Sequence, residues 1–254
     1  MPVVETSRQQ LIEHLHALGI SRGTDLVVHA RLISFGKVEG GVEGVVDALR
    51  EVVGPVGTIA MPSFTLHLRE ADVFDRAQTV PEDVGVLARH FRLLPETQRS
   101  KCPMHSYAAI GPKASAIAAS DETQSMGKGS TFETLRKRGF AMLMLGCSIH
   151  QGATQVHQVE ADVGVPYREW IQLPRSVRDG DGRVRRIEVH YYGRRKDSGV
   201  TLDLAPLERE LLEQGATKRV ALPYGHSHLL EVTAFHEVAS AMLRKDPNAF
   251  VAHP

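Results

Sequence analysis

The segment from 25 to 62 constrains the fold more than any other part of the sequence, because in it two short apolar runs flank one amphipathic helix. The runs Asp25–His29 and Thr58–Pro62 carry β-branched residues and are typical of buried strands. Between them, apolar residues recur at helical spacing from Val42 to Val53, and a Gly-Pro pair then ends the helix. Such a strand–helix–strand unit predicts two parallel strands joined by a right-handed crossover.

Other periodic segments extend this unit into an α/β fold with a central mixed sheet flanked by helices. Residues 140–145 form another buried apolar run, whereas residues 186–192 alternate as a more exposed strand would. A capping-box pattern at Ser7 and Gln10 opens an N-terminal helix that ends at Gly19. Further helices are expected at 112–119, 132–137, 207–214 and 229–244.

The domain organisation is expected to be simple. The sequence contains no internal repeat and no low-complexity linker, so its 254 residues are expected to form a single domain spanning 1–254. One segment, 66–82, has little periodicity and many charges. Long irregular segments in compact domains are often lids or binding loops. We therefore predict a lid or ligand-binding loop at 66–82, with an ordinary surface loop as the alternative.

Charge and cysteine content narrow the classes of partner. The 30 Lys and Arg residues balance 30 Asp and Glu residues, which gives no support for binding to nucleic acid or to a membrane surface. No stretch approaches the ~18 apolar residues of a spanning helix, and the N-terminus lacks a secretory signal pattern, so a cytoplasmic location is expected. Cys102 and Cys147 are too few for a disulfide framework. A monomer and a homodimer both remain open.

The segment His29–Gly41 follows the first strand and enters the first crossover helix, which is where open α/β sheets usually bind ligands. Backbone N–H groups near Gly40 and Gly41, together with the helix dipole, could hold a pyrophosphate. The segment matches neither G-x-G-x-x-G nor a P-loop, which disfavours nicotinamide and nucleoside-triphosphate chemistry. The alternative is an ordinary strand-to-helix turn.

A second candidate site lies between Gly146 and Glu160, where a buried strand is followed by a new helix with Thr154 as the expected N-cap. His157 then falls in the first turn, where the positive helix end disfavours the imidazolium form, and Glu160 can reach the same face. A neutral imidazole oriented by a carboxylate can take the proton that an amine loses during acylation. The alternative is a solvated helix face, because His-x-x-Glu is common.

Two other chemistries use neighbouring residues. His150, His157 and Glu160 could hold zinc in a hydrolase, although the spacing of the histidines differs from H-E-x-x-H. Cys102 could form a covalent acyl-enzyme with His105 as its activating base. Neither is required by the pattern, and direct attack by the amine is simpler.

Together these segments resemble the aminoglycoside 3-N-acetyltransferase family, with colinear matches over nearly the whole chain. The matching motifs include VVHARLISFG at 27–36, GPVGTIAMPSF at 54–64, GVLARHFR at 85–92, GKGS at 127–130 and TQVHQVE at 154–160. The resemblance implies that family's own α/β fold, acetyl-coenzyme A as co-substrate and no metal. It further implies acetylation of a small-molecule amine, most directly the 3-amino group of a 2-deoxystreptamine aminoglycoside.

The resemblance also implies roles for individual residues. His157 corresponds to the general base and Glu160 to its partner. The coenzyme-binding residues that it implies are Ala30, Arg31, Leu32, Ser34, Phe35, Gly41 and Ser106. The acceptor-binding candidates are Phe64, Asp75, Lys128 and Glu160. Backbone N–H groups near 30–32 or 61–64 are the candidate donors to the oxyanion.

Three departures from the family pattern bear on the acceptor and on the covalent alternative. The chain has His29-Ala30 where the family commonly has His-Ser, and Cys102-Pro103 where it has His-Pro. A cation, Lys128, replaces the glutamate of a typical Gly-Glu-Gly-Ser segment. An acetyltransferase for a different amine is therefore the main alternative, and a non-catalytic coenzyme-binding protein is a further one.

Overall fold

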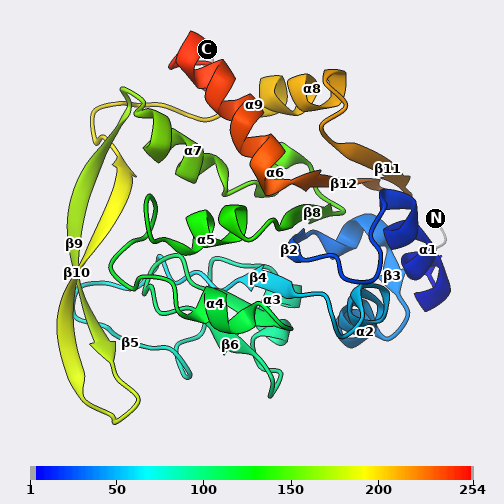
Figure 1. Cartoon of the computed structure of the whole chain (residues 1–254), viewed down its shortest axis with the longest axis horizontal. Helices are drawn as coiled ribbons and strands as arrows, with labels where there is room; N and C mark the ends of the chain where they lie inside the picture. Colours follow the sequence, from blue (N-terminus) through cyan, green and yellow to red (C-terminus); the bar gives the residue numbers. More distant parts are fainter. Residues whose placement is uncertain (1–3, 253–254) are drawn as a thin grey trace.

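Seven strands form the central sheet of the computed structural model, which describes residues 4–252 (Figure 1). Their order is β11-β12-β8-β2-β4-β7-β6. The bounds are β2 Leu26–Ala30, β4 Ile59–Pro62, β6 Gln98–Arg99, β7 Tyr107–Ile110, β8 Ala141–Leu145, β11 Lys218–Leu222 and β12 Gly225–Glu231. The inner strands β8, β2 and β4 are parallel and the outer pairings are antiparallel, which confirms the mixed sheet.

Helices cover both faces of this sheet because the inner strands are apolar on both sides. Along β2, Leu26 and Val28 pack on one face and Val27 on the other, as the two-residue period of a strand requires. The first face is covered by α1 Arg8–Leu18, α2 Gly41–Val53 and α3 Val86–Phe91. The second is covered by α4 Ala114–Ala118, α5 Thr131–Lys137, α7 Val156–Val163, α8 Ala205–Glu213 and α9 Val232–Lys245. The short elements η1 Leu32–Phe35 and α6 Ile149–Gly152 follow β2 and β8.

The local signals of the N-terminal half are confirmed. Ser7 accepts the N–H of Gln10, and the Gln10 side chain accepts the N–H of Ser7, so the capping box is complete. Gly19 ends α1 with φ 99°, a left-handed conformation that favours glycine. Helix α2 joins β2 to β4 as the crossover predicted from 25–62.

A second sheet stands at one end of the molecule and contains the long β9–β10 hairpin (Figure 1). Its strands are β5 Val73–Asp75, β9 Arg168–Arg178 and β10 Val184–Arg194, in the order β10-β9-β5. The strand expected at 186–192 therefore exists, but it lies outside the central sheet. A small parallel pair, β1 Glu5–Thr6 and β3 Lys37–Val38, completes the strands of residues 4–252.

Two other expectations need correction. The helix expected at 229–244 begins at Val232, because Leu229, Leu230 and Glu231 pair with β8 as the end of β12. The segment 66–82 is not wholly irregular, because β5 lies within it and pairs with β9, and Phe74 is buried. None of the helices among residues 4–252 is both long enough and apolar enough to cross a membrane.

Candidate active site

A cavity of about 360 Å³ lies at the carboxyl ends of the three parallel strands. Its wall includes Arg31 after β2, Phe64 after β4 and Cys147 after β8, and His157 of α7 borders the same space. Loops that leave parallel strands at this edge commonly form the ligand site of an open α/β sheet. The cavity is therefore the candidate active site.

His157 and Glu160 form the pair that their spacing predicts. The Nδ1 atom of His157 lies 2.8 Å from Oε2 of Glu160, one helical turn further along α7. The Glu160 side chain is 0% exposed, whereas the His157 side chain is 23% exposed. The carboxylate thus lies behind the imidazole, and the imidazole is the member of the pair that reaches the cavity.

Two residues at the start of the β9–β10 hairpin hold Glu160, and a third holds one of these two. Arg168 Nε lies 2.8 Å from Glu160 Oε2, although its N–H is not aligned for a hydrogen bond. The Tyr167 hydroxyl donates to Glu160 Oε1 at 2.9 Å. Arg168 is in turn fixed by donating to the Tyr192 carbonyl at 3.0 Å. The carboxylate is therefore surrounded by donors and by positive charge.

These contacts decide the charge of Glu160. Burial alone would raise its pKa, but the His157 hydrogen bond, the charges of His157 and Arg168 and the Tyr167 hydroxyl together lower it below the ordinary value. An ionised carboxylate only accepts hydrogen bonds, so the contact with Glu160 requires the tautomer of His157 that carries its proton on Nδ1. Nε2, which bonds to none of residues 4–252, is then the basic nitrogen. Arg168 Nη2 also lies 2.9 Å from Nδ1, and because both groups are donors in this tautomer, this contact is not a hydrogen bond in it.

Two further imidazoles border the cavity and stay neutral. Burial lowers the pKa of His29 to about 4. Burial, with the nearby charges of His157 and Arg168, lowers the pKa of His105 to about 3. His105 Nδ1 lies 2.6 Å from Ser125 Oγ, and its ring packs edge-on against Phe64. Near neutral pH these two rings contribute polar surface without charge.

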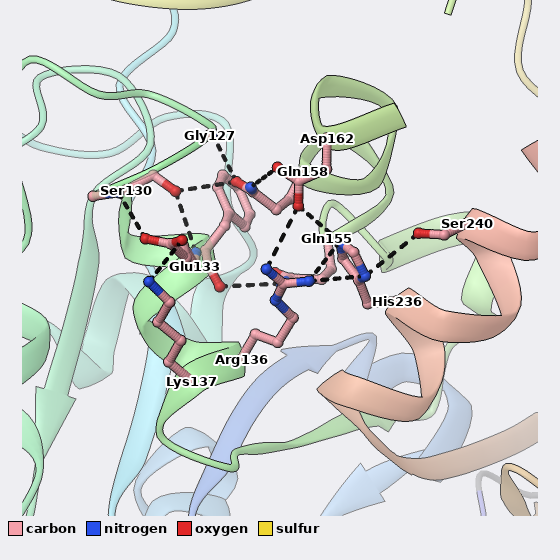
Figure 2. A network of polar contacts seen from close by, with 12 residues as sticks. Gly127, Ser130, Glu133, Arg136, Lys137, Gln155, Gln158, Asp162, His236 and Ser240 are labelled. Carbon is pink, nitrogen blue, oxygen red and sulfur yellow. Dashed lines mark hydrogen bonds and ion pairs between the residues drawn. The ribbon is translucent and has the colours of Figure 1, made fainter. Parts of the chain in front are cut away.

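Helix α7 is also held by polar contacts of Gln158 and Asp162 (Figure 2). Gln158 Oε1 accepts the N–H of Gly127 at 2.8 Å and the hydroxyl of Ser130 at 3.0 Å. One turn later, Asp162 contacts His236 of α9 at 2.8 Å. Two residues one helical turn apart on α7 thus connect the helix to the segment that leads into α5 and to α9.

One local expectation for α7 is wrong. Gln155, rather than Thr154, is the N-cap, and its side chain makes no capping bond. The chain enters the helix through tight i→i−3 turns, in which the His157 N–H bonds to the Thr154 carbonyl. Thr154 instead lines the cavity beside His157. His157 still lies in the first turn of the helix.

Only some of the residues implied for coenzyme binding line the cavity. Ala30 and Arg31 line the cavity, and Gly41 begins α2 with φ 57°. The others turn inward: Leu32 packs on the core, Phe35 is fully buried, Ser34 donates to the Gly146 carbonyl, and Ser106 donates to the Ser63 carbonyl. Of this set, Arg31 offers an exposed cationic side chain at the cavity.

The acceptor-binding candidates are also divided. Phe64 lines the cavity, and Glu160 lies behind His157. Asp75 lines a separate hollow of about 350 Å³ beside the hairpin, where its Oδ1 accepts two backbone N–H groups of its own turn. Lys128 is exposed and does not line the cavity.

Sequence reasoning missed several cavity residues. Asp83 contributes a carboxylate, and Gln151 and Tyr191 contribute polar groups. Arg168, which pairs with Glu160, was missed as well. Arg168 follows directly on the Val-Pro-Tyr motif at 165–167, which is the one local signal that could have drawn attention to it.

The alternative chemistries find little support in the geometry. Among the described residues, His150 does not join His157 and Glu160 within 4.8 Å as a three-ligand set, and its Nδ1 accepts the Leu204 N–H. Arg168 places a cation against Glu160, where a metal ion would be repelled. Cys102 is buried in a small apolar cluster outside the cavity, and burial raises the pKa of its thiol.

Comparison with known proteins identifies the family. Residues 27–244 match the family model described as aminoglycoside 3-N-acetyltransferase. Aminoglycoside N(3)-acetyltransferase III of Acinetobacter baumannii is 33% identical over 196 residues, which cover 69% of this chain and 68% of the relative. Aminoglycoside N(3)-acetyltransferase IV of Salmonella sp is 29% identical over 255 residues, which cover 98% of this chain and 92% of the relative.

Solved structures share the fold. The apoenzyme of aminoglycoside acetyltransferase AAC(3)-IVa has a TM-score of 0.81 at 27% identity and covers 99% of this chain and 93% of its own. The binary structure of AAC-IIIb with CoASH has a TM-score of 0.83 at 23% identity and covers 95% and 97% of the two chains.

Proposed function

Because this chain belongs to the aminoglycoside 3-N-acetyltransferase family and is an acetyltransferase, we propose that it acetylates the 3-amino group of a 2-deoxystreptamine aminoglycoside with His157 as general base. The acetyl donor in this proposal is acetyl-coenzyme A, and the whole chain, 1–254, acts as one acetyltransferase domain. The observation that carries the proposal is the orientation of His157, whose Nδ1 is held by the buried Glu160 and whose ring borders the cavity.

The proton transfers follow from that orientation. His157 Nε2 accepts the proton that the acceptor nitrogen loses as it attacks the thioester carbon. The resulting imidazolium is stabilised by Glu160, and it returns the proton to the departing thiolate when the carbon–sulfur bond breaks. The acetyl group thus ends on nitrogen and the coenzyme leaves as a thiol, with no change in the protonation of the enzyme over one cycle.

Charged groups at the cavity support the proposal that one part of it binds the coenzyme and another part binds the acceptor amine. The exposed Arg31 guanidinium suits a phosphate group, and the N-terminus of α2 at Gly41 follows on the same loop. A relative of the same fold was solved with CoASH bound. Asp83 suits an acceptor ammonium group, and Leu66 brings the start of the 66–82 segment to the cavity as part of an acceptor-binding loop.

A different amine is the second candidate, and the cavity itself favours it. Asp83 is the one carboxylate among the residues that line it, whereas a polycationic aminoglycoside is best held by several. The exposed Lys128 adds a cation in the segment where the family typically has a glutamate. An acceptor with a single ammonium group would need no more than Asp83.

Thiol release from acetyl-coenzyme A, followed with a thiol-reactive dye, tests both candidates. The panel contains 2-deoxystreptamine aminoglycosides with and without a free 3-amino group, together with simple mono-amines. Release only with a free 3-amino group, and an acetyl group found there by mass spectrometry, supports the aminoglycoside proposal. Release only with mono-amines supports the second candidate. No release with any amine contradicts both.

A further inference from the structure

A second cluster of ionisable side chains lies away from the cavity, where α8 contacts β12. Figure 1 shows the places of α8, α6 and β12 in the fold. Glu208 projects from α8, and His226 and His228 project from β12. None of the three lines the cavity that His157 borders. The acetyltransferase proposal assigns them no role.

Both histidines of this cluster face one carboxylate oxygen, at ion-pair distances that are longer than an ordinary hydrogen bond. His226 Nε2 lies 3.6 Å and His228 Nε2 lies 3.4 Å from the same atom, Oε1 of Glu208. All three ligand atoms lie within 4.8 Å of one another. Neither Nε2 atom makes a hydrogen bond to any of residues 4–252, although both are buried, and the His228 side chain is 0% exposed. Buried polar atoms normally have hydrogen-bond partners, whereas these two nitrogen atoms have only the more distant Glu208 oxygen.

A tetrahedral zinc ion would account for these distances. Zinc binds imidazole nitrogen at about 2.0–2.1 Å and carboxylate oxygen at about 2.0–2.2 Å. Two corners of a tetrahedron with such bonds are separated by about 3.3–3.5 Å, which is close to the two nitrogen–oxygen distances. Two imidazoles and one carboxylate are also a familiar zinc ligand set, with the fourth position left to water.

The surrounding backbone holds these side chains in place. His226 and His228 are two residues apart on β12, so both project from the same face of the strand. Their rings contact edge to face, with centroids 4.8 Å apart. Glu208 Oε2 accepts the Ile149 N–H at 2.9 Å, which leaves Oε1 directed toward the histidines. The site is therefore organised before any ion binds.

We propose that Glu208, His226 and His228 form a binding site for one Zn²⁺ ion, with water in its fourth position. The ion would connect α8 to β12 across the edge of the central sheet. Through Glu208 Oε2 it would also fix Ile149, the first residue of α6, whose Gln151 and Gly152 line the cavity. The site stabilises the fold beside the active site and takes no part in acetyl transfer.

Metal binding to the full chain, prepared without a histidine tag and stripped with a chelator, tests this proposal. Zn²⁺ is titrated in competition with a chromophoric indicator, and the bound metal is counted by mass spectrometry. We expect one Zn²⁺ per chain, a melting temperature that rises with added Zn²⁺, and, with Co²⁺ in its place, the visible absorption of a tetrahedral site. A stripped protein that takes up no Zn²⁺ would overturn the proposal.

Variants locate the ion. Glu208→Gln and His226→Asn should each weaken Zn²⁺ binding by at least about 10-fold, because loss of a direct ligand costs no less than loss of an outer partner. His226 is the safer histidine to change, since its side chain is 24% exposed and that of His228 is fully buried. His150→Asn is the matched control and should keep wild-type affinity. Binding that survives Glu208→Gln and His226→Asn but is lost in His150→Asn would place the ion elsewhere and refute the site.

Discussion

Helix α7 carries two histidine–carboxylate pairs that have the same separation and face opposite ways. His157 lies 2.8 Å from Glu160, and His236 of α9 lies 2.8 Å from Asp162. In the first pair the carboxylate is fully buried and the imidazole borders the cavity. In the second, the imidazole packs into the interior between α7 and α9. The distance within a pair therefore does not distinguish the two imidazoles, whereas access to the cavity does.

The charges behind the two pairs differ as well. Arg168, 3% exposed, lies 2.8 Å from Glu160, whereas Arg136, 26% exposed, lies 3.7 Å from Asp162. Both carboxyl groups have a lowered pKa despite burial, which alone would raise it. The cavity-facing pair is thus the more tightly enclosed of the two, so changes to it should have the larger consequences.

The largest expected contrast is between His157→Ala and His236→Ala. The first should lower kcat by roughly 10²–10⁴-fold, the usual contribution of a positioned general base. The second removes an interior contact and should lower the free energy of unfolding by about 1–3 kcal/mol while leaving kcat within a few-fold of wild type. Steady-state kinetics and urea denaturation of both variants measure this. Equal losses of kcat would end the distinction between the pairs.

Replacing each arginine by methionine compares the enclosure of the two carboxylates. Arg168→Met leaves Glu160 buried without its cation and should cost about 3–5 kcal/mol of unfolding free energy. Arg136→Met removes a longer, partly exposed contact and should cost no more than about 1 kcal/mol. Urea denaturation at neutral pH gives both values. A cost for Arg136→Met that matched the other would show that the second pair is equally enclosed.

Acid should reduce the stabilisation that both pairs give to the folded protein, because the pKa values of Glu160 and Asp162 are lowered in the folded state. A carboxyl group whose pKa is lower in the folded state than in the unfolded chain adds stability above its unfolded pKa, and this is lost as pH falls through the folded pKa. The stability difference between wild type and Glu160→Gln should therefore be constant above pH ~5 and shrink below pH ~4. Asp162→Asn should show the same trend. If the stability difference between wild type and the variant grew as the pH fell, the prediction would be wrong.

Parts of this architecture could be predicted from the sequence because local patterns determine them. The inner strands β2 and β8 are buried on both faces and so appear as continuous apolar runs. The capping box fixes the start of α1 at Ser7. His157 and Glu160 are one helical turn apart, so their contact follows from spacing alone.

Other parts depend on contacts between distant segments. Strand β9 contains Pro174 and several charged residues, and it forms through its pairing with the whole of β10. Asp83 and His105 reach the cavity from separate loops, and no local pattern places them beside His157. Gln155 replaces Thr154 as N-cap because the chain enters α7 through a tight turn. The covalent and zinc alternatives at the cavity could be weighed only once the burial of Cys102 and the position of Arg168 were seen.

The smallest expected effect concerns Lys128, which belongs to the segment behind α7. Its neighbour Gly127 donates to Gln158, on the side of the helix away from His157, and Lys128 itself is exposed and outside the cavity wall. Lys128→Glu should therefore change the KM for any accepted amine by less than about threefold, as expected of one exposed charge. Kinetics with a polycationic and a mono-cationic acceptor measure this. A KM lowered tenfold or more for the polycation alone would mean that the acceptor extends to 127–130, and that the two sides of α7 are less separate in function than they are in structure.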